Sequence, residues 1–155
     1  MVPHEQSKPS IRPLAVCVFR HGGKILVTEL CDPQNKEIFY RPLGGGIEFG
    51  ELAADTIKRE LMEELGAEVH DLCYLGTLEN IFTYDGQPGH EIVLVFDGKF
   101  VDESLYTRSS IVGHEEGVGE FSNFWKSLDF FREGEFPLYP DHLLELLEGD
   151  HPIFG

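Results

Sequence analysis

Positive charge is scarce in this chain of 155 residues, where twelve lysines and arginines stand against twenty-eight aspartates and glutamates. The formal net charge is −16 at pH 7. A field of this sign repels the phosphate backbone of duplex nucleic acid. It attracts divalent cations, and hard ions such as Mg²⁺ prefer carboxylate oxygens. The composition therefore argues against a duplex nucleic acid partner and favours a metal ion.

Long apolar runs are absent, since the longest, over residues 14–19, covers only six residues. A membrane-spanning helix needs roughly 20 apolar residues, so we expect no membrane partner. The start of the chain lacks the charged-then-apolar pattern of a secretion signal, and its first thirteen residues include three prolines. We expect a flexible lead-in over residues 1–12 and a single domain over residues 13–155.

Cysteine is also rare and odd in number, with Cys17, Cys31 and Cys73 as the three thiols. They share no C-x-x-C spacing, which disfavours a zinc site and a disulfide framework. All three have apolar neighbours in the sequence. The pattern predicts reduced thiols in the core of a cytoplasmic protein.

Alternating and β-branched residues predict a sheet built largely from hairpins. The first hairpin joins residues 13–20 and 24–30 across His21-Gly22-Gly23. We expect further strands at residues 39–43, 69–84, 91–101 and 121–126, with a turn at 85–89 and a polar loop at 103–119. Apolar residues spaced three and four apart predict helices at 51–65 and 139–148. The fold class is therefore α+β with mostly antiparallel strands.

The helix expected over residues 51–65 has one apolar face, formed by Ala54, Ile57, Leu61 and Leu65. Gly66 follows it as a stop signal.

Three glutamates, Glu60, Glu63 and Glu64, lie beside the apolar face of this helix at spacings of three and four. Side chains at these spacings are neighbours, and their like charges repel one another. A bound cation would relieve this repulsion. The alternative is a solvated acidic face neutralised by Lys58 and Arg59.

The residues around the helix spell G-x5-E-x7-R-E-U-x-E-E-x-G-U from Gly45 to Ala67, where U is a bulky aliphatic. This pattern resembles the signature of the Nudix hydrolases. It matches at the seven fixed positions and at Leu61, and departs at Ala67, where the family has a larger aliphatic. The resemblance implies an α/β/α sandwich built on a mixed, largely antiparallel sheet.

The resemblance also implies a metal site that holds Mg²⁺ or Mn²⁺. It makes Glu60 and Glu64 the principal metal ligands, and Glu63 a ligand of a further ion or of the attacking water. The carbonyl of Gly44, just before the motif, would contribute to the same site. Carboxylate and carbonyl oxygens are the ligands that these hard ions prefer.

Other residues of the motif would support this site. Arg59 and Glu51 are expected to orient the carboxylates. Gly45 and Gly46 lack a Cβ, so their backbone can approach a diphosphate closely. Arg41, just ahead of the glycines, is a candidate to contact a substrate phosphate.

In the family, a loop ahead of the last core strand often supplies a general base. Here that loop contains Glu115 and Glu116, our first candidates, followed by Glu120. His114 could serve instead. The alternative is a solvated acidic loop without a catalytic role.

Four aromatic residues, Phe39, Tyr40, Phe82 and Tyr84, could stack on a nucleotide base or belong to the core. We expect Trp125 to belong to the core. No set of residues selects a particular base or sugar.

The resemblance implies metal-dependent hydrolysis of the diphosphate linkage in a small nucleoside diphosphate derivative, such as a nucleotide, a nucleotide sugar or ADP-ribose. A homodimer is also common for the family. The alternative is a non-catalytic module of the same fold that binds a nucleotide or has a regulatory role.

Overall fold

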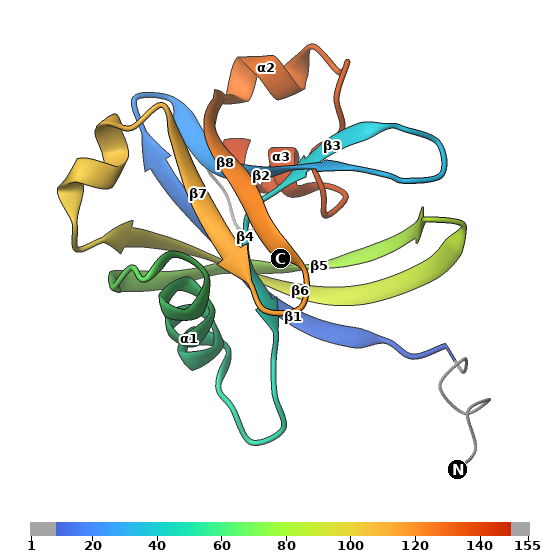
Figure 1. The fold of residues 1–155 in the computed structure, drawn as a ribbon, viewed down its shortest axis with the longest axis horizontal. Helices are drawn as coiled ribbons and strands as arrows, with labels where there is room; N and C mark the ends of the chain where they lie inside the picture. Colours follow the sequence, from blue (N-terminus) through green and yellow to red (C-terminus); the bar gives the residue numbers. More distant parts are fainter. Residues whose placement is uncertain (1–8, 150–155) are drawn as a thin grey trace.

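The structure is a computed structural model that describes residues 9–149. Figure 1 shows its strands and helices. The strands are β1 (Arg12–His21), β2 (Lys24–Cys31), β3 (Ile38–Arg41), β4 (Leu43–Gly46), β5 (Val69–Tyr84), β6 (Gln87–Phe100), β7 (Ser110–Glu115) and β8 (Gly119–Ser127). The helices are α1 (Ala53–Leu65), the 3₁₀ helix η2 (Glu103–Thr107), α2 (Leu128–Arg132) and α3 (Leu143–Glu148).

The strands form a mixed sheet in the order β5-β6-β1-β2-β8-β7, with β3 paired to β2 and β4 paired to β1. Strands β1 and β6 run parallel, whereas the other pairs are antiparallel. The predicted hairpin of β1 and β2 is present, but the two strands pair only beside its turn, at Arg20↔Ile25 and His21↔Lys24. Beyond these pairs β1 and β2 diverge, and β4 and β3 lie along their inner edges.

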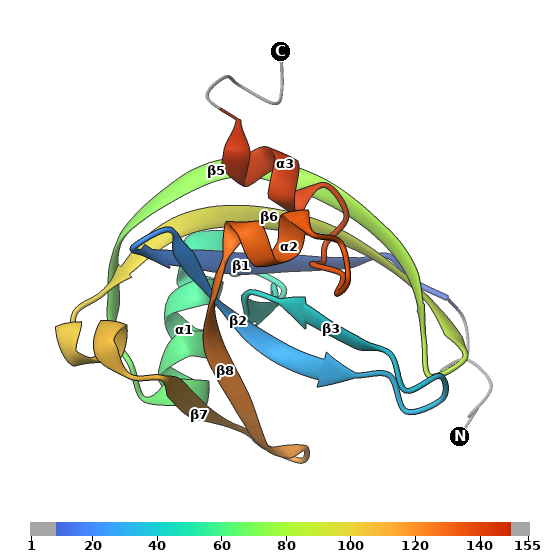
Figure 2. The same cartoon turned by 90° about the horizontal axis from the view of Figure 1, so that it is seen from above.

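Strand β1 is buried on both sides because helices cover both faces of the sheet (Figure 2). Its residues Ala15, Cys17 and Phe19 pack in the core cluster that contains Ile57 and Leu61 of α1. The alternate residues of β1 pack in a second cluster with α2 and α3. This arrangement confirms the predicted α+β class and the α/β/α sandwich.

Helix α1 begins at Ala53, two residues later than predicted, and ends at the predicted Gly66, which is left-handed with φ 65°. Ile57 and Leu61 are fully buried, as expected for the apolar face. The later start leaves Glu51 in the loop before the helix. Ala67, the position that departs from the motif, is buried in the α1-side core.

The prediction of a polar loop over residues 103–119 is wrong. Helix η2 and strand β7 occupy most of this segment, and β7 pairs with β8 from Ser110↔Phe124 to Glu115↔Gly119. Only Ile111 and Gly113 of β7 are buried. The alternating burial of an edge strand with few apolar residues left little hydrophobic pattern in the sequence.

The helix predicted over residues 139–148 is shorter in the structure, where α3 begins at Leu143. The residues before it run beside β3, since Tyr40 N–H donates to Pro137 O at 3.0 Å and Tyr139 N–H donates to Tyr40 O at 2.9 Å. These contacts with a distant strand override the local helical pattern. The sequence also missed the short helix α2.

Two further predictions differ from the structure or meet its limits. Cys17 is buried, but Cys31 and Cys73 are exposed, so the prediction of three core thiols is wrong for two of them. Strand β1 begins at Arg12, the last residue of the predicted lead-in. Residues 1–8 of that lead-in lie outside the described residues. In the described part of the chain, no helix is both long and apolar enough to cross a membrane.

Candidate active site

Three carboxylates from two separate elements meet beside the glycines of β4. Glu60 and Glu64 come from α1, and Glu115 comes from the end of β7. They line one cavity of about 370 Å³ together with residues 44–46. The cavity lies where β1 and β2 diverge, because side chains of both strands form its floor.

The position of Glu64 is unfavourable for a negative charge. Burial and the neighbouring charges of Glu60 and Glu115 raise the pKa of Glu64 to about 8. Hydrogen-bonding contact with the same two carboxyl groups shifts the pKa in the same direction. A divalent cation at this point would offset the repulsion and let all three groups ionise.

The available donors fit a hard ion. Among residues 9–149, no group of three or more His, Cys, Asp or Glu side chains is placed to hold a metal ion by itself. Mg²⁺ is commonly held by one or two carboxylates and keeps several waters, so it does not require such a group. Glu60, Glu64 and the Gly44 carbonyl are the groups of this chain that could hold it.

Gly44 and Gly45 make room for this arrangement. A Cβ on Gly45 would lie 2.5–2.8 Å from the carboxylate atoms of Glu60, so the carboxylate rests directly on the backbone of β4. A Cβ on Gly44 would lie 2.1 Å from the backbone oxygen of Ala15, and Gly44 has φ +154°. A carboxylate of the protein itself therefore lies close to the backbone of Gly45.

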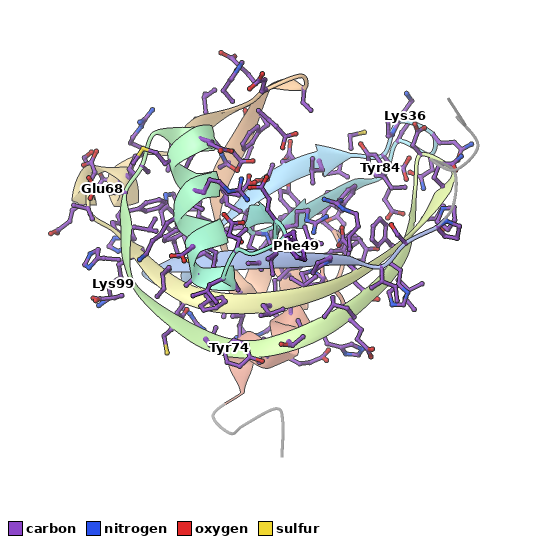
Figure 3. The ribbon with its side chains drawn as sticks, turned by 90° about the horizontal axis from the view of Figure 1, so that it is seen from below. Lys36, Phe49, Glu68, Tyr74, Tyr84 and Lys99 are labelled. Atoms are coloured by element: carbon purple, nitrogen blue, oxygen red, sulfur yellow. The ribbon has the colours of Figure 1, made fainter. Side chains whose placement is uncertain are left out.

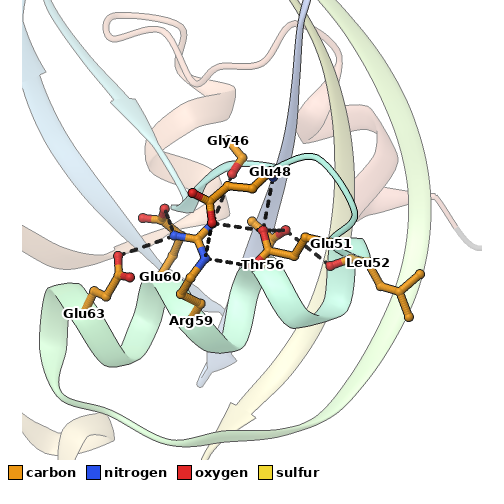
Figure 4. Close-up of polar contacts among 8 residues, drawn as sticks. All are labelled: Gly46, Glu48, Glu51, Leu52, Thr56, Arg59, Glu60 and Glu63. Carbon is orange, nitrogen blue, oxygen red and sulfur yellow. Dashed lines mark hydrogen bonds and ion pairs between the residues drawn. The ribbon is translucent and has the colours of Figure 1, made fainter.

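Arg59 connects the loop before α1 to the glutamates (Figure 4). Its guanidinium donates to both carboxylate oxygens of Glu51, at 2.8 and 3.0 Å. It also donates to Glu60 Oε1 at 2.9 Å and to the carbonyl of Gly46 at 3.2 Å. These bonds fix the side chain of Glu60 between the helix and β4, and they raise the pKa of Arg59.

Glu51 is held in place by several donors. Besides Arg59, the hydroxyl of Thr56 donates to Glu51 at 2.7 Å and the backbone N–H of Glu48 donates at 3.2 Å. The bonds from Arg59 and Thr56 are the main causes that lower the pKa of Glu51 to about 2. Thr56 lies outside the fixed positions of the motif, so the sequence did not indicate its part in this network.

The other predicted acidic residues lie farther from the cavity lined by the glycines. Glu63 is 59% exposed and has a 3.4 Å contact with Arg59. It lines an outer pocket whose other residues are Glu60, Glu64, His114, Glu115 and Glu116. Glu115 lines both the outer pocket and the inner cavity, whereas Glu116 lines only the outer one. Glu120 borders neither.

A second cavity of about 370 Å³ adjoins the first, and both are lined by Arg12, Leu30, Arg41 and Glu91. Arg41 donates to Glu91 Oε1 at 3.2 Å, and the Glu91 carboxylate is buried. Arg12 lines both cavities and was not indicated by the sequence.

Of the aromatic residues considered above, Phe39, Phe82 and Tyr84 line the second cavity. Tyr40 instead lies in the core and donates to Glu29 at 2.6 Å. Trp125 packs against the α1-side core, as predicted. Tyr139 also lines the second cavity, although the sequence assigned it to a helix.

Comparison with known proteins agrees with this geometry. The family model described as the NUDIX domain matches residues 11–141. The chain belongs to the Nudix family. Solved Nudix structures share its fold: a NUDIX hydrolase from Nitrosomonas europaea has a TM-score of 0.61 and 19% identity, with 91% of this chain and 87% of that chain covered. A MutT NUDIX hydrolase from Burkholderia pseudomallei also has a TM-score of 0.61 and 19% identity, covering 92% of this chain and 99% of the other. These neighbours share the fold, and the family assignment rests on the match over residues 11–141.

Curated Nudix relatives are similar over part of their length. An NAD-capped RNA hydrolase NudC from Pseudomonas aeruginosa is 27% identical over 121 residues, which are 78% of this chain and 38% of that protein. The NudC of Vibrio atlanticus is 32% identical over 69 residues, which are 44% of this chain and 25% of that protein. The matches thus span between a quarter and about two fifths of these relatives.

Proposed function

We propose that this Nudix protein hydrolyses the diphosphate linkage of a small nucleoside diphosphate derivative with the help of Mg²⁺ or Mn²⁺. The observation that carries the proposal is the convergence of Glu60, Glu64 and Glu115 on one cavity beside residues 44–46. Carboxylates alone repel a diphosphate, so a metal ion between them and the substrate is required.

When bound, the metal ion activates the attacking water and offsets charge on the diphosphate oxygens. Glu60 and Glu64 hold the ion with the Gly44 carbonyl, and Arg59 keeps Glu60 in place through its bond of 2.9 Å. Glu51 orients Arg59 in turn through two hydrogen bonds. The exposed Glu63 would bind a further ion or the attacking water.

Glu115 is the general base in this scheme, because it reaches the inner cavity and contacts Glu64. Glu116 faces only the outer pocket and has at most an electrostatic part. The backbone of Gly45 and Gly46 receives the diphosphate, and Arg41 contacts a phosphate at the junction of the two cavities.

The test is phosphate or nucleotide release with Mg²⁺ or Mn²⁺ from nucleoside triphosphates, ADP-ribose, nucleotide sugars, dinucleoside polyphosphates and NADH. NADH joins the panel because the NudC relatives are named for an NAD cap. Glu64→Gln should lower turnover by at least about 100-fold, since it removes a charged ligand while preserving shape. Glu68→Gln, a change at an exposed glutamate beyond the helix, is the control and should keep full activity.

The opposing function is a nucleotide-binding or regulatory module without catalysis. Full retention of Glu60, Glu63 and Glu64 opposes it, because a module without catalysis has no need of all three ligands. Nucleotide binding with no cleavage of any panel substrate in the presence of metal would favour this module instead. A cytoplasmic location and a homodimer stay predictions, which cell fractionation and light scattering would test.

A further inference from the structure

The second cavity has an aromatic wall assembled from three separate parts of the chain. Phe39 of β3 lies between Tyr84 of β5, at a ring distance of 6.0 Å, and Tyr139, at 5.6 Å. Both pairs are edge-to-face, with interplanar angles of 78° and 68°. Tyr84 is 39% exposed, so part of its ring stays uncovered. Clustered aromatic rings left partly open are a platform on which a flat ligand can stack.

The two hairpin tips that border this cavity are tied together. Asp32, in the loop between β2 and β3, accepts hydrogen bonds from the backbone N–H of Gln34 at 2.9 Å and of Asp85 at 3.2 Å. The tips lie side by side in Figures 1 and 2, and in Figure 3 the labelled Tyr84 lies near Lys36 of the neighbouring loop. The hydrogen bonds of Asp32 therefore hold the two tips together, and we call these tips, with the aromatic wall, the rim of the second cavity.

The rim carries acceptors in excess of donors. Glu37 and Asp141 both line the cavity and both are exposed. They lie close enough to Tyr139 for their negative charges to act on its hydroxyl. The two arginines that line this cavity, Arg12 and Arg41, also line the first one and so lie at the junction. The part of the cavity beyond them suits a ligand group that carries no negative charge and donates hydrogen bonds.

Hydrogen bonds of two buried residues, Asn80 and Glu91, connect the aromatic wall to the junction. Asn80 accepts from the backbone N–H of Asp141 at 3.1 Å and lies 3.4 Å from Glu91 Oε1, which it approaches as a donor. Glu91 in turn accepts from Arg41 at 3.2 Å. The cation at the junction and the segment that carries Tyr139 are thus held in one network.

We propose that the second cavity binds the base of the substrate, and that it selects bases with an exocyclic amino group. Phe39, Tyr84 and Tyr139 stack on the ring, while Glu37 and Asp141 accept hydrogen bonds from the amino group. Arg12 and Arg41 at the junction then face the first phosphate, and the scissile linkage extends toward Glu64. This inference rests on the proposed function and narrows its substrate class to derivatives of adenosine, cytidine or guanosine.

The first experiment measures binding of AMP and of ribose 5-phosphate by calorimetry in Mg²⁺. Neither probe contains an anhydride, so neither can be hydrolysed by the proposed reaction. AMP should bind at least about fivefold more tightly, because base stacking on an aromatic side chain is worth this much or more. Tyr84→Leu should remove most of that advantage. Tyr74→Leu is the matched control, since Tyr74 is on the same strand, is 46% exposed and does not line the cavity.

The second experiment compares CMP with UMP, because cytosine has an amino group and an unprotonated N3 where uracil has a carbonyl oxygen and an N3–H. CMP should bind about fivefold more tightly or better, and Glu37→Gln and Asp141→Asn should each reduce the ratio. These surface substitutions keep the size of the side chain, so a folded protein is expected. Equal binding of CMP and UMP by the native protein would overturn the selectivity.

The two proposals can fail separately. Equal binding of AMP and ribose 5-phosphate, or equal effects of Tyr84→Leu and Tyr74→Leu, would refute the base site even if the protein hydrolyses diphosphates. Absence of hydrolysis with base-dependent binding through Tyr84 would refute the proposed reaction and retain the base site.

Discussion

Gly44 and Gly45 each leave no room for a side chain, but for different physical reasons. A matched pair of substitutions to alanine distinguishes the two reasons. Gly44→Ala should lower the free energy of unfolding by more than about 2 kcal/mol, because the new Cβ meets the backbone of Ala15. Gly45→Ala should change stability by less than about 1 kcal/mol, since it meets only the end of the Glu60 side chain. It should nevertheless weaken Mg²⁺ binding by about 10- to 100-fold. Denaturant unfolding and metal titration measure these effects, and equal loss of stability in both variants would contradict this account.

The pair formed by Glu51 and Arg59 should make stability depend on pH. The pKa of Glu51 falls from an ordinary value of 4.5 to about 2 in the folded protein. A lowered carboxyl pKa stabilises the fold above the unfolded value, and this stabilisation is lost as the pH falls from 4.5 toward 2. The difference in unfolding free energy between the native protein and Glu51→Gln should thus be largest near pH 7 and shrink in acid.

Glu48→Gln is the control for this pH experiment. Glu48 lies in the same loop and 3.4 Å from Arg59, but its side chain is 68% exposed. Exposed ion pairs contribute little to stability, so this variant should follow the native protein at every pH. If the difference between the native protein and Glu51→Gln stayed constant across the pH range, folding would not lower the pKa of Glu51.

The sequence indicated the glutamates of the acidic site and two of the residues that support them, Glu51 and Arg59, but not every support. Glu60 and Glu64 were visible because a motif and a helical spacing both point to them. Thr56 and Arg12 were not, because a single hydroxyl or guanidinium has no distinctive spacing. Arg12 lines the same cavities as Arg41 because β1 pairs with β6, which places Arg12 opposite Glu91.

At the scale of elements, the hairpin of β7 and β8 decides which acidic residue can act as a base. Glu115 ends β7 and lines both the first cavity, beside residues 44–46, and the outer pocket. Glu116 begins the turn and lines only the outer pocket. Glu115→Gln should lower turnover by about 100-fold or more, the contribution expected of a general base. Glu116→Gln should lower it by less than about threefold. Turnover is measured by steady-state kinetics on the best substrate of the panel. A larger loss of turnover in Glu116→Gln than in Glu115→Gln would reverse the assignment.

Elements with a strong local pattern were predicted closely. Strand β5 has the predicted bounds, and α1 ends where Gly66 required. By contrast, β7 and the segment around Tyr139 take their conformation from strands far away in the sequence. Their backbone groups form hydrogen bonds with β8 and β3, and partners this distant in the sequence cannot be predicted from a short window of residues.

At the scale of the whole molecule, the net charge of −16 predicts that metal ions stabilise the fold. Mg²⁺ at ten times its Kd should add about 1.4 kcal/mol to the free energy of unfolding, which raises Tm by roughly 3–6 °C. Screening of the general repulsion also stabilises the protein, so NaCl of equal ionic strength is the reference. In Glu64→Gln, most of the difference between the rise in Tm with Mg²⁺ and the rise with NaCl should disappear. An equal rise in Mg²⁺ and NaCl would indicate screening without a specific site.

The sequence by itself determined the acidic helix, the glycines at residues 44–46 ahead of it and the mixed fold class. These features depend on residue type and on spacing within short windows. The tertiary structure alone decided that Glu115 joins Glu60 and Glu64, and that Tyr139 joins Phe39 and Tyr84. These groups are brought together by strand pairing between distant segments. Spacing along a chain defines one face of a helix, whereas the register of distant strands defines a cavity.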